Sequence, residues 1–251
     1  MDTFAPDPFR HHPELRDLVG DPEASFFRRL DMAALDAQLA ELGFGEDWRH
    51  PDDVREAMRR ATLAGHEGPL WVFGFGSLMW DPSMRFDEVR IATAPGHARH
   101  FCLWDDGARG SRDRPGLMAA LDAAGPDEPG CHGLAFRIPP GEVEAESAIL
   151  WQREVIAPGY VATFIPVETA AGRLRALAFL ADREADVIRT DLSAAEQADM
   201  IAHAEGVLGT NLAYLENMIA HLAALGLEDA AMAALWRRVC AIRQASGGET
   251  G

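Results

Sequence analysis

Short hydrophobic runs, separated by glycine, proline and aspartate, fill the middle of the chain. Runs of this length between turn-forming residues are typical of β-strands, and we predict six or seven strands here. A helix is predicted to interrupt them from about Glu142 to about Glu154, after Pro139, Pro140 and Gly141. The runs are residues 70–75, 89–94, 99–104, 117–121, 131–138, 160–167 and 174–181.

Helical spacing of apolar residues replaces this pattern in the last third of the chain. Ser193 and Glu196 form a capping box, in which the side chains satisfy exposed amides at a helix start. The apolar stripe that follows predicts a helix ending at Gly209, and two more stripes predict one helix up to Gly226 and another after it. The stripes are Met200, Ile201, Ala204, Val207 and Leu208, then Leu212, Leu215, Met218, Ile219 and Leu222, then Met232, Leu235, Trp236 and Val239. Strands followed by helices, with one helix inserted, predict an α+β fold.

The first 69 residues are polar and carry two predicted helices. Leucines at near-helical spacing predict the first helix, with Gly43 as its stop. A second short helix is predicted after Asp52 and Asp53, with Val54 and Met58 as its buried face. The leucines of the first helix are Leu30, Leu35, Leu39 and Leu42.

Turn-forming residues at 66–69 separate these helices from the first strand. We therefore predict three parts, which are an N-terminal helical extension over residues 1–69, a main domain over residues 70–245 and a flexible tail over residues 246–251. The sequence contains no fixed-period repeat and no low-complexity tract.

Composition narrows the class of protein. The 251 residues are 48% hydrophobic and 25% charged, which predicts a folded, soluble chain with a substantial core. Acidic residues outnumber basic residues by 40 to 23, and the net charge of −17 opposes binding to nucleic acids and to anionic membrane surfaces. All 23 basic residues are arginine, which excludes Schiff-base lysines, lysine nucleophiles and the lysine of phosphate-binding loops.

Cysteine usage and the N-terminal residues indicate the cellular compartment in which the protein is expected to lie. The three cysteines are far apart and form no CxxC pair, so we predict neither a disulfide scaffold nor a structural zinc site. The first residues lack a cationic stretch followed by an apolar one, and no apolar stretch is long enough to span a membrane. We therefore expect a cytoplasmic protein without nucleic-acid or membrane partners. The sequence leaves the oligomeric state open.

Two glycines and a serine follow the first predicted strand, in the segment Gly74-Phe75-Gly76-Ser77-Leu78. Glycine allows a tight turn and lets a ligand approach the backbone, and free amides beside a serine can hold a carboxylate or an oxyanion. A strand exit that uses glycine only for bending accounts for the pattern equally well. The segment is not a phosphate-binding loop, which needs a lysine, and it lacks the G-x-S-x-G signature of hydrolases.

Glu154 is predicted to lie where the inserted helix gives way to the next strand. Its carboxylate would face the negative end of the helix dipole beside the apolar Val155 and Ile156. Both effects raise a carboxyl pKa, which suits a general base or acid near neutral pH. The other glutamates of this helix, Glu144 and Glu146 among them, are expected to be solvated.

Arginines and histidines give weaker indications. The loop over residues 109–116 carries three arginines, and we keep Arg109 as a candidate carboxylate anchor while expecting Arg112 and Arg114 to be solvated. His97 and His100 are three apart in a predicted strand, so their side chains point to opposite faces and are not expected to bind a metal together.

Four segments in order are similar to motifs of the ChaC-type γ-glutamylcyclotransferases. They are FGFGSLMWDP, RGSRDRPGLMAALD, LWQREVIAPGY and GTNLAYLENMIAHLAALG, and the resemblance runs from about Leu70 to about Arg243. It implies a small barrel-like sheet flanked by helices. It also implies cleavage of glutathione to 5-oxoproline and cysteinylglycine, with no metal or organic cofactor.

The same resemblance implies roles for particular residues. It assigns catalysis to Glu154 and substrate binding to the loop from Phe75 to Leu78. Phe75 is a departure, because the family usually has tyrosine there, and loss of one neutral hydrogen bond costs about 1 kcal/mol. The substrate-binding residues implied are Phe75, Gly76, Ser77, Leu78, Arg109, Tyr160 and Tyr214.

Other functions fit parts of the sequence. A cyclotransferase for other γ-glutamyl peptides or amines would keep Glu154 and change the pocket for the leaving group. A non-catalytic protein on the same scaffold would bind a γ-glutamyl ligand without turnover. A metal-dependent hydrolase would need a ligand cluster that the sequence does not show.

Overall fold

The structure, a computed structural model, describes residues 6–125 and 129–247. All seven hydrophobic runs form strands, which confirms the sequence prediction. They are β1 (Leu70–Gly74), β2 (Glu88–Ala94), β3 (His97–Asp105), β4 (Gly116–Ala123), β5 (Cys131–Ile138), β6 (Tyr160–Thr169) and β7 (Gly172–Ala181).

The strands form one sheet in the order β1-β5-β2-β6-β7-β4-β3. β1 also pairs in parallel with β7 through Val72 and Leu177, so that β1, β5, β2, β6 and β7 close into a small barrel. The β3–β4 hairpin extends from β7 along one side. The predicted α+β fold with a small barrel is confirmed.

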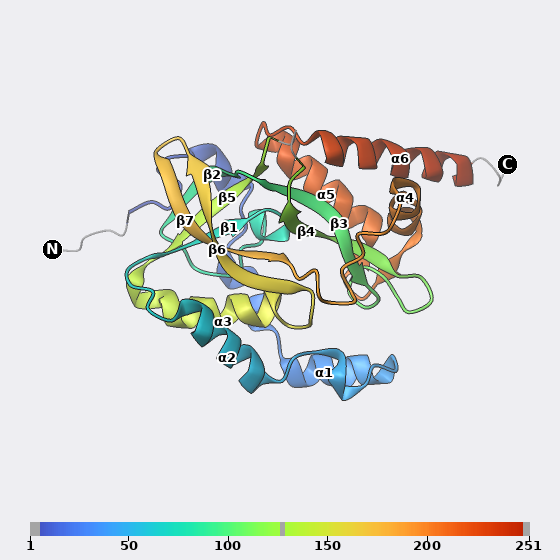
Figure 1. Cartoon of the computed structure of the whole chain (residues 1–251), viewed down its shortest axis with the longest axis horizontal. Coiled ribbons are helices and arrows are strands. Elements are labelled where there is room, and N and C mark those ends of the chain that lie inside the picture. Colours follow the sequence, from blue (N-terminus) through green and yellow to red (C-terminus); the bar gives the residue numbers. More distant parts are fainter. Residues whose placement is uncertain (1–5, 126–128, 248–251) are drawn as a thin grey trace.

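Helices cover the barrel on two sides (Figure 1). α3 enters between β5 and β6, as predicted. α2 of the N-terminal segment lies beside α3, whereas α1 lies beyond the end of α2, at the lower right of the view. α4, α5 and α6 gather at the opposite side, beside β3 and β4. The helices are α1 (Met32–Glu41), α2 (Asp52–Leu63), α3 (Val143–Glu154), α4 (Ala194–His203), α5 (Asn211–Ala224) and α6 (Ala230–Gly247). Residues 248–251 of the expected tail lie outside the described residues.

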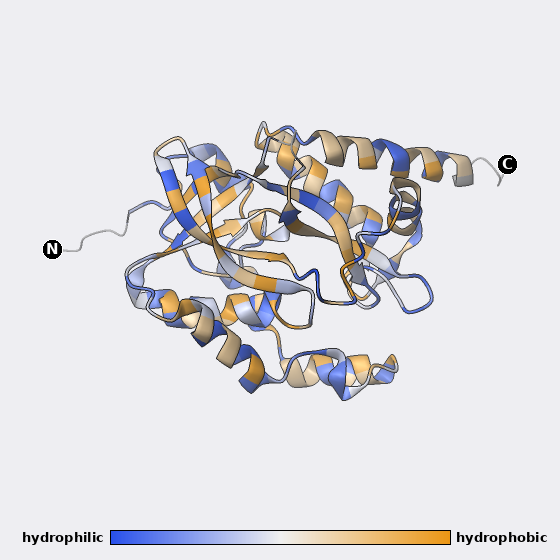
Figure 2. Cartoon of the chain, viewed as in Figure 1, coloured by the Kyte–Doolittle hydropathy of each residue, from blue (hydrophilic) through white to orange (hydrophobic). Residues whose placement is uncertain are grey.

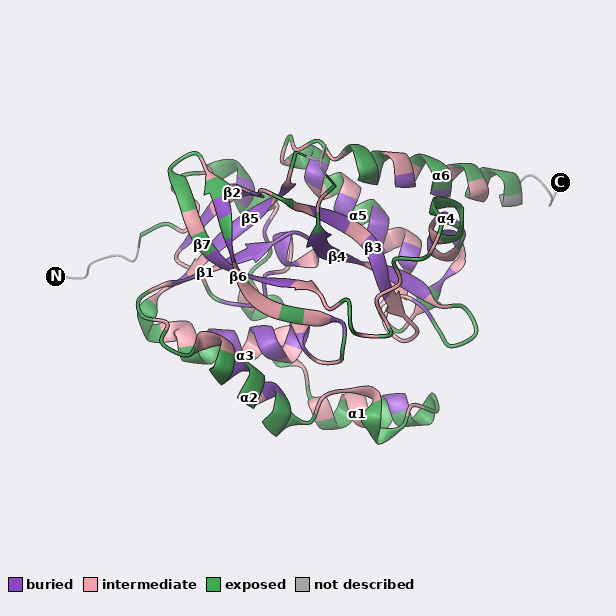
Figure 3. Ribbon diagram, in the orientation of Figure 1, coloured by how far each residue is buried: buried purple, intermediate pink, exposed green. Residues whose placement is uncertain are grey.

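Apolar side chains form two buried clusters. The larger cluster joins the barrel to the C-terminal helices and contains Trp151 and Phe179, whose rings pack edge to face. The smaller one contains Phe73 and Phe75 at the end of β1. Hydrophobic residues dominate the strands, whereas exposed positions concentrate on the outer faces of the helices (Figures 2 and 3). No helix in the described ranges combines the length and apolar character needed to cross a bilayer.

The prediction for the helix after Ser193 is wrong at its end. Helix α4 stops at His203, and residues 205–210 form a short hairpin of β8 (Glu205–Gly206) and β9 (Gly209–Thr210). The amides of Val207 and Leu208 donate to carbonyls of the β3–β4 loop, at 2.9 and 2.8 Å. Hydrogen bonds to a distant loop therefore replace the helical bonds that the apolar stripe predicted.

The predicted buried face of α2 is also wrong. Val54 and Met58 are each 39% exposed, whereas Arg55 and Arg59 are buried. Arg59 turns toward α3, where it donates to the Ser147 hydroxyl at 2.8 Å and pairs with the Glu144 carboxylate. The side of α2 that faces α3 therefore carries Arg59, and not the predicted Val54 and Met58.

Glu146 of α3 is not solvated, contrary to expectation. Its side chain is 1% exposed and accepts two hydrogen bonds from Arg28, at 2.6 and 3.0 Å. The backbone N–H of Arg85 donates a third, at 2.8 Å. A buried carboxylate of this kind is held because charged donors replace the water it loses.

Candidate active site

The backbone turns sharply where β1 ends, and residues Ser77–Met79 form a single 3₁₀ turn. Across the described residues, no hydrogen bond is donated by the backbone N–H groups of Gly76, Ser77 and Leu78. A methyl group placed on Gly76 would lie 3.5 Å from the Tyr214 hydroxyl. The loop therefore presents three amides beside a buried tyrosine, which is an arrangement that can bind an anionic oxygen.

A buried arginine supports this loop from behind. The Arg99 side chain has no exposed surface, and it donates to the carbonyls of Phe75 and His132, at 2.6 and 2.7 Å. It also pairs with Asp229, which precedes α6. This role could not be predicted from the sequence, because Arg99 lies in an ordinary strand.

Phe75 takes part in the loop through its carbonyl. Its ring packs in the smaller apolar cluster with Phe73 and Ala135 and is 6% exposed. A phenyl ring suits that environment, because a hydroxyl there would need a buried partner.

Glu154 is the last residue of α3, and its side chain is 14% exposed. Nε of Arg153 lies 2.8 Å from its Oε1, and Nη2 of the same guanidinium donates to the Ser77 hydroxyl at 2.8 Å. Nη1 donates to the carbonyl of Asp81. Arg153 thus joins the carboxylate to the glycine loop, a role that the sequence analysis missed.

The pKa of Glu154 is raised above its ordinary value. Burial is the largest cause, and the nearby Asp81 carboxylate adds to it. Arg153 acts in the opposite direction by stabilising the charged form. The carboxyl group therefore holds a proton more readily than an exposed glutamate, as expected for a group that takes up and returns protons.

Two tyrosines lie close to Glu154. The Tyr160 hydroxyl donates to the carbonyl of Ala119 at 2.8 Å, and the Tyr214 ring packs between Trp80 and Phe101. Burial, with the Glu154 carboxylate among the further causes, raises the pKa of Tyr214 to about 12 and that of Tyr160 well above its ordinary value. Both hydroxyls stay protonated near neutral pH and remain hydrogen-bond donors.

Arg109 approaches the same tyrosine from the β3–β4 loop. Its guanidinium carbon lies 5.8 Å from the centre of the Tyr214 ring, and it donates to the carbonyl of Leu208 in the β8–β9 hairpin. Burial lowers the pKa of this guanidinium, which still leaves it charged near neutral pH. Arg109 is thus a half-buried cation beside Tyr214.

Two residues that the sequence analysis passed over shape this loop. The Asp105 carboxylate accepts from the amides of Ala108, Arg109 and Gly110. The buried Asn211 side chain forms two hydrogen bonds with the backbone of Leu117, at 2.8 and 2.7 Å. An Asp shortly before glycines is a recognisable signal for a turn in which its carboxylate accepts from the following amides, whereas Asn211 carries no local signal for its bonds to Leu117.

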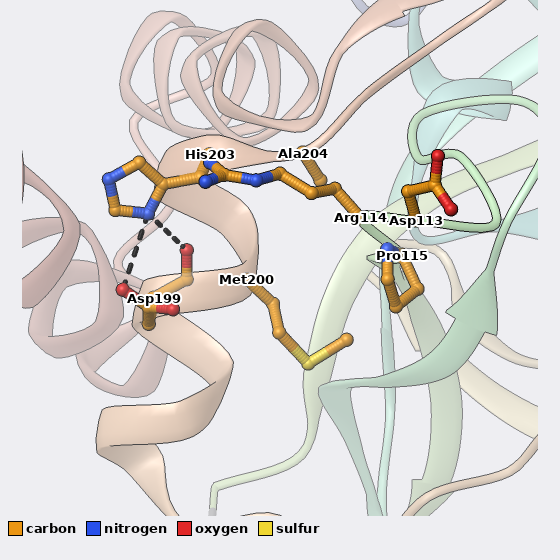
Figure 4. Close-up of a pocket in the computed structure, with 7 residues that line it drawn as sticks. All are labelled: Asp113, Arg114, Pro115, Asp199, Met200, His203 and Ala204. Atoms are coloured by element: carbon orange, nitrogen blue, oxygen red, sulfur yellow. Dashed lines mark hydrogen bonds and ion pairs between the residues drawn. The ribbon is translucent and has the colours of Figure 1, made fainter.

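The remaining loop arginines lie elsewhere. Arg112 packs over Phe44 of the N-terminal segment, with its guanidinium carbon 4.3 Å from the ring centre. Arg114 lines a surface cavity of about 320 Å³ between the loop and α4 (Figure 4). None of the predicted site residues lines this cavity, whose walls are Asp113, Arg114, Pro115, Asp199, Met200, His203 and Ala204.

The structure thus brings Glu154, the Gly76–Leu78 loop, Tyr160, Tyr214 and Arg109 into one neighbourhood. A carboxyl group with a raised pKa suits proton transfer, the free amides suit a developing oxyanion, and Arg109 suits a substrate carboxylate. Among the residues described, no group of three or more His, Cys, Asp and Glu side chains is placed to hold a metal ion.

Comparisons with known proteins bear on this site. The sequence profile of the ChaC-like protein family matches residues 70–242. The chain is 39% identical over 180 residues to the glutathione-specific γ-glutamylcyclotransferase of Escherichia coli (strain K12), covering 70% of this chain and 76% of that protein. It is 30% identical over 165 residues to the protein of the same name in Schizosaccharomyces pombe, covering 59% and 80%.

A solved structure shares the fold. A crystal structure of a γ-glutamylcyclotransferase specific to glutathione from yeast matches with a TM-score of 0.64 at 21% identity, covering 70% of this chain and 98% of that one. The family profile leaves residues 1–69 outside its match.

Proposed function

Because the chain belongs to the ChaC-like family, we propose that it is a γ-glutamylcyclotransferase that cleaves glutathione to 5-oxoproline and cysteinylglycine. The observation that carries the proposal is the position of Glu154, joined through Arg153 to the Ser77 hydroxyl of the glycine loop. The names of the relatives from Escherichia coli and Schizosaccharomyces pombe support glutathione as the substrate.

Under this proposal the reaction is an internal displacement. The α-amine of the γ-glutamyl group attacks its own γ-carbonyl, so that a five-membered lactam forms and the γ-peptide bond breaks. Glu154 takes one proton from the α-ammonium group, and the attacking nitrogen releases a second proton to solvent once its bond to the γ-carbon has formed. Glu154 delivers its proton to the departing nitrogen as the γ-peptide bond breaks, and the freed amine of cysteinylglycine takes up another proton from solvent. One carboxyl group serves both steps and returns to its starting state, so no net proton is consumed.

The other residues bind and orient the substrate in this mechanism. The amides of Gly76, Ser77 and Leu78 stabilise the oxyanion of the tetrahedral intermediate. Arg109 holds a substrate carboxylate, while Tyr160 and Tyr214 line the space beside Glu154. Folding the extended glutamyl chain so that its amine meets its carbonyl supplies a large part of the acceleration.

The raised pKa of Glu154 fits this assignment. A base whose pKa approaches the working pH is both present in the ionised form and strong enough to remove a proton. The net charge of −17 works against an anionic substrate at long range. Local donors, Arg109 and the loop amides, therefore supply the attraction.

The proposal includes no metal or organic cofactor and places the reaction in the cytoplasm. It also keeps Phe75 as a loop residue that contributes its backbone. A ring buried among apolar residues supports a packing role for this side chain.

The test is an incubation with glutathione in metal-chelated buffer, with 5-oxoproline and cysteinylglycine measured by mass spectrometry. Wild type is expected to form both products in equal amounts, and Glu154→Gln to lose them. Glu144→Gln is the matched control, because Glu144 lies on the same helix and is 82% exposed. If the protein converted other γ-glutamyl amides but not glutathione, the proposed substrate would be wrong. If Glu154→Gln still formed the products, the catalytic role of Glu154 would be wrong.

A further inference from the structure

Two neighbouring residues of the N-terminal segment contact the helix that carries Glu154. Phe27 and Arg28 lie in a 3₁₀ turn formed by Phe27–Arg29. Arg28 pairs with Glu146 in the first half of α3, and the Phe27 ring lies against Arg153 at its end. Positions 146 and 153 are two helical turns apart and share one face of the helix. The turn therefore contacts α3 both near its start and at the residue before Glu154.

The guanidinium of Arg153 is almost fully enclosed. Its side chain is 3% exposed, and its nitrogens reach Glu154, Ser77 and Asp81. A guanidinium forms such hydrogen bonds in its own plane, which leaves its flat faces for aromatic contact. The Phe27 ring centre lies 4.3 Å from the guanidinium carbon.

We propose that Phe27 is a positioning residue, whose ring holds Arg153 in the orientation that joins the Glu154 carboxylate to the Ser77 hydroxyl. This inference rests on the proposed function, because it concerns the geometry of the same site. The inference about Phe27 goes beyond the proposed function because it gives the N-terminal extension a direct part in arranging the catalytic carboxylate. The family profile does not cover this extension.

The consequence is a defined effect on the protonation of Glu154. The charged and titratable groups that act on it are Arg153 on α3, Asp81 after the glycine loop, Tyr160 on β6 and Tyr214 on α5. Arg153 is the cation among them. If its guanidinium loses its alignment, burial and Asp81 act unopposed, and the pKa of Glu154 rises further.

The chain offers a matched control. Phe44 also belongs to the N-terminal segment, and its ring centre lies 4.3 Å from the guanidinium carbon of Arg112. The two contacts have the same chemistry and the same distance. They differ in that Arg153 touches Glu154 and Ser77, whereas Arg112 belongs to no part of the proposed site.

The experiment compares Phe27→Leu, Phe27→Tyr and Phe44→Leu with wild type. The pH dependence of kcat/KM on glutathione is recorded, and the Glu154 carboxyl is titrated by ¹³C NMR, with Glu154→Gln identifying its signal. Phe27→Leu is expected to move both the acidic limb of the pH profile and the carboxyl titration to higher pH. The shift is at most about half a pH unit, which corresponds to the whole free energy of an ordinary cation–π contact. Phe27→Tyr is expected to restore wild-type values, and Phe44→Leu to leave them unchanged.

Equal titration midpoints in Phe27→Leu, Phe44→Leu and wild type would overturn the inference and leave Phe27 a packing residue. If Phe27→Leu does not fold, Arg153→Met provides a second measurement. This variant removes the guanidinium itself, so the pKa of Glu154 should rise at least as far as the rise expected for Phe27→Leu. An unchanged titration in Arg153→Met would also overturn the inference. The NMR titration needs no turnover, so an inactive wild type with a shifted variant would reject the proposed function and keep the positioning role.

Discussion

Two glutamates on helix α3 show how one residue type comes to have different roles at the two ends of one element. Glu146 and Glu154 are eight residues apart and both largely buried. Glu146 accepts three hydrogen bonds from Arg28 and the backbone of Arg85. Within the described parts of the chain, the one cationic side chain that pairs with Glu154 is Arg153, and that guanidinium also donates to Ser77 and Asp81.

The difference lies in how completely each carboxylate is satisfied. A carboxylate whose oxygens accept several hydrogen bonds, among them those from an arginine, is fixed in place and serves as an anchor. One that is buried with fewer donors has a raised pKa and can exchange protons with a ligand. Burial alone therefore does not mark a catalytic carboxylate, and the number of its donors separates the two glutamates.

Replacing Glu154 should reduce activity and leave the fold intact, whereas disrupting the anchor at Glu146 should reduce stability. For Glu154→Gln we expect kcat/KM on glutathione to fall by about 10²–10⁴-fold, the usual contribution of a general acid–base group, while the protein stays folded. Steady-state kinetics together with far-UV circular dichroism measure both. If Glu154→Gln retained more than a tenth of wild-type kcat/KM, Glu154 would not be the catalytic one of the two glutamates.

The anchor at the other end of α3 is expected to control stability. Arg28→Met leaves the Glu146 carboxylate buried with fewer donors, and breaking a buried pair in this way costs about 3–5 kcal/mol. Urea denaturation measures the loss. In the double variant Arg28→Met with Glu146→Leu we expect much of it to be recovered, since no buried charge is left unpaired. A single variant as stable as wild type would show that the pair contributes little.

Replacing Tyr160 tests whether a neighbour of Glu154 also takes part in catalysis. Tyr160→Phe removes the hydrogen bond to Ala119, which should cost about 1 kcal/mol of stability. Because Glu154 itself is unchanged, kcat/KM is expected to fall by less than about tenfold. Thermal denaturation and steady-state kinetics measure the two effects, and a loss as large as that of Glu154→Gln would mean that the tyrosine takes part in proton transfer.

The pH dependence of stability gives the smallest effect, because Arg153 offsets part of the cost of burying the Glu154 charge. In the unfolded chain Glu154 titrates near its ordinary pKa of 4.5, and in the folded protein at a higher value. Between these values the folded state binds a proton that the unfolded state has released, so wild-type stability falls as pH rises through this window. Glutamine does not titrate. Below pH 4.5, Glu154→Gln should show no gain in stability over wild type from this effect. The gain should grow as the pH rises through the window and stay constant above it. Urea denaturation at several pH values measures this difference in the free energy of unfolding.

Much of the fold could be predicted, because local signals and tertiary structure agree. The strands follow apolar runs between turn residues, and the Ser193–Glu196 capping box begins α4 as expected. The predictions failed where distant contacts override local pattern. The backbone of residues 207 and 208 bonds to the β3–β4 loop instead of continuing the helix, and in α2 Arg59 is buried toward α3, where it pairs with Glu144.

The site shows the same limit. Glu154 and the glycine loop could be selected because their local sequence has chemical meaning. Arg153, Arg99 and Asn211 could not, since a charged or polar residue in a helix or strand has no local mark of the partner it will meet. Their roles depend on segments far apart in the sequence, as when Arg99 of β3 reaches the carbonyl of Phe75.

The central claim is that the substrate's own amine, and not water, displaces the leaving group at Glu154. Turnover of glutathione in H₂¹⁸O with analysis of the products by mass spectrometry tests it directly. The account predicts 5-oxoproline without ¹⁸O, because both of its ring-closing atoms come from the substrate. Glutamate carrying ¹⁸O in its γ-carboxyl group would show hydrolysis and contradict the account.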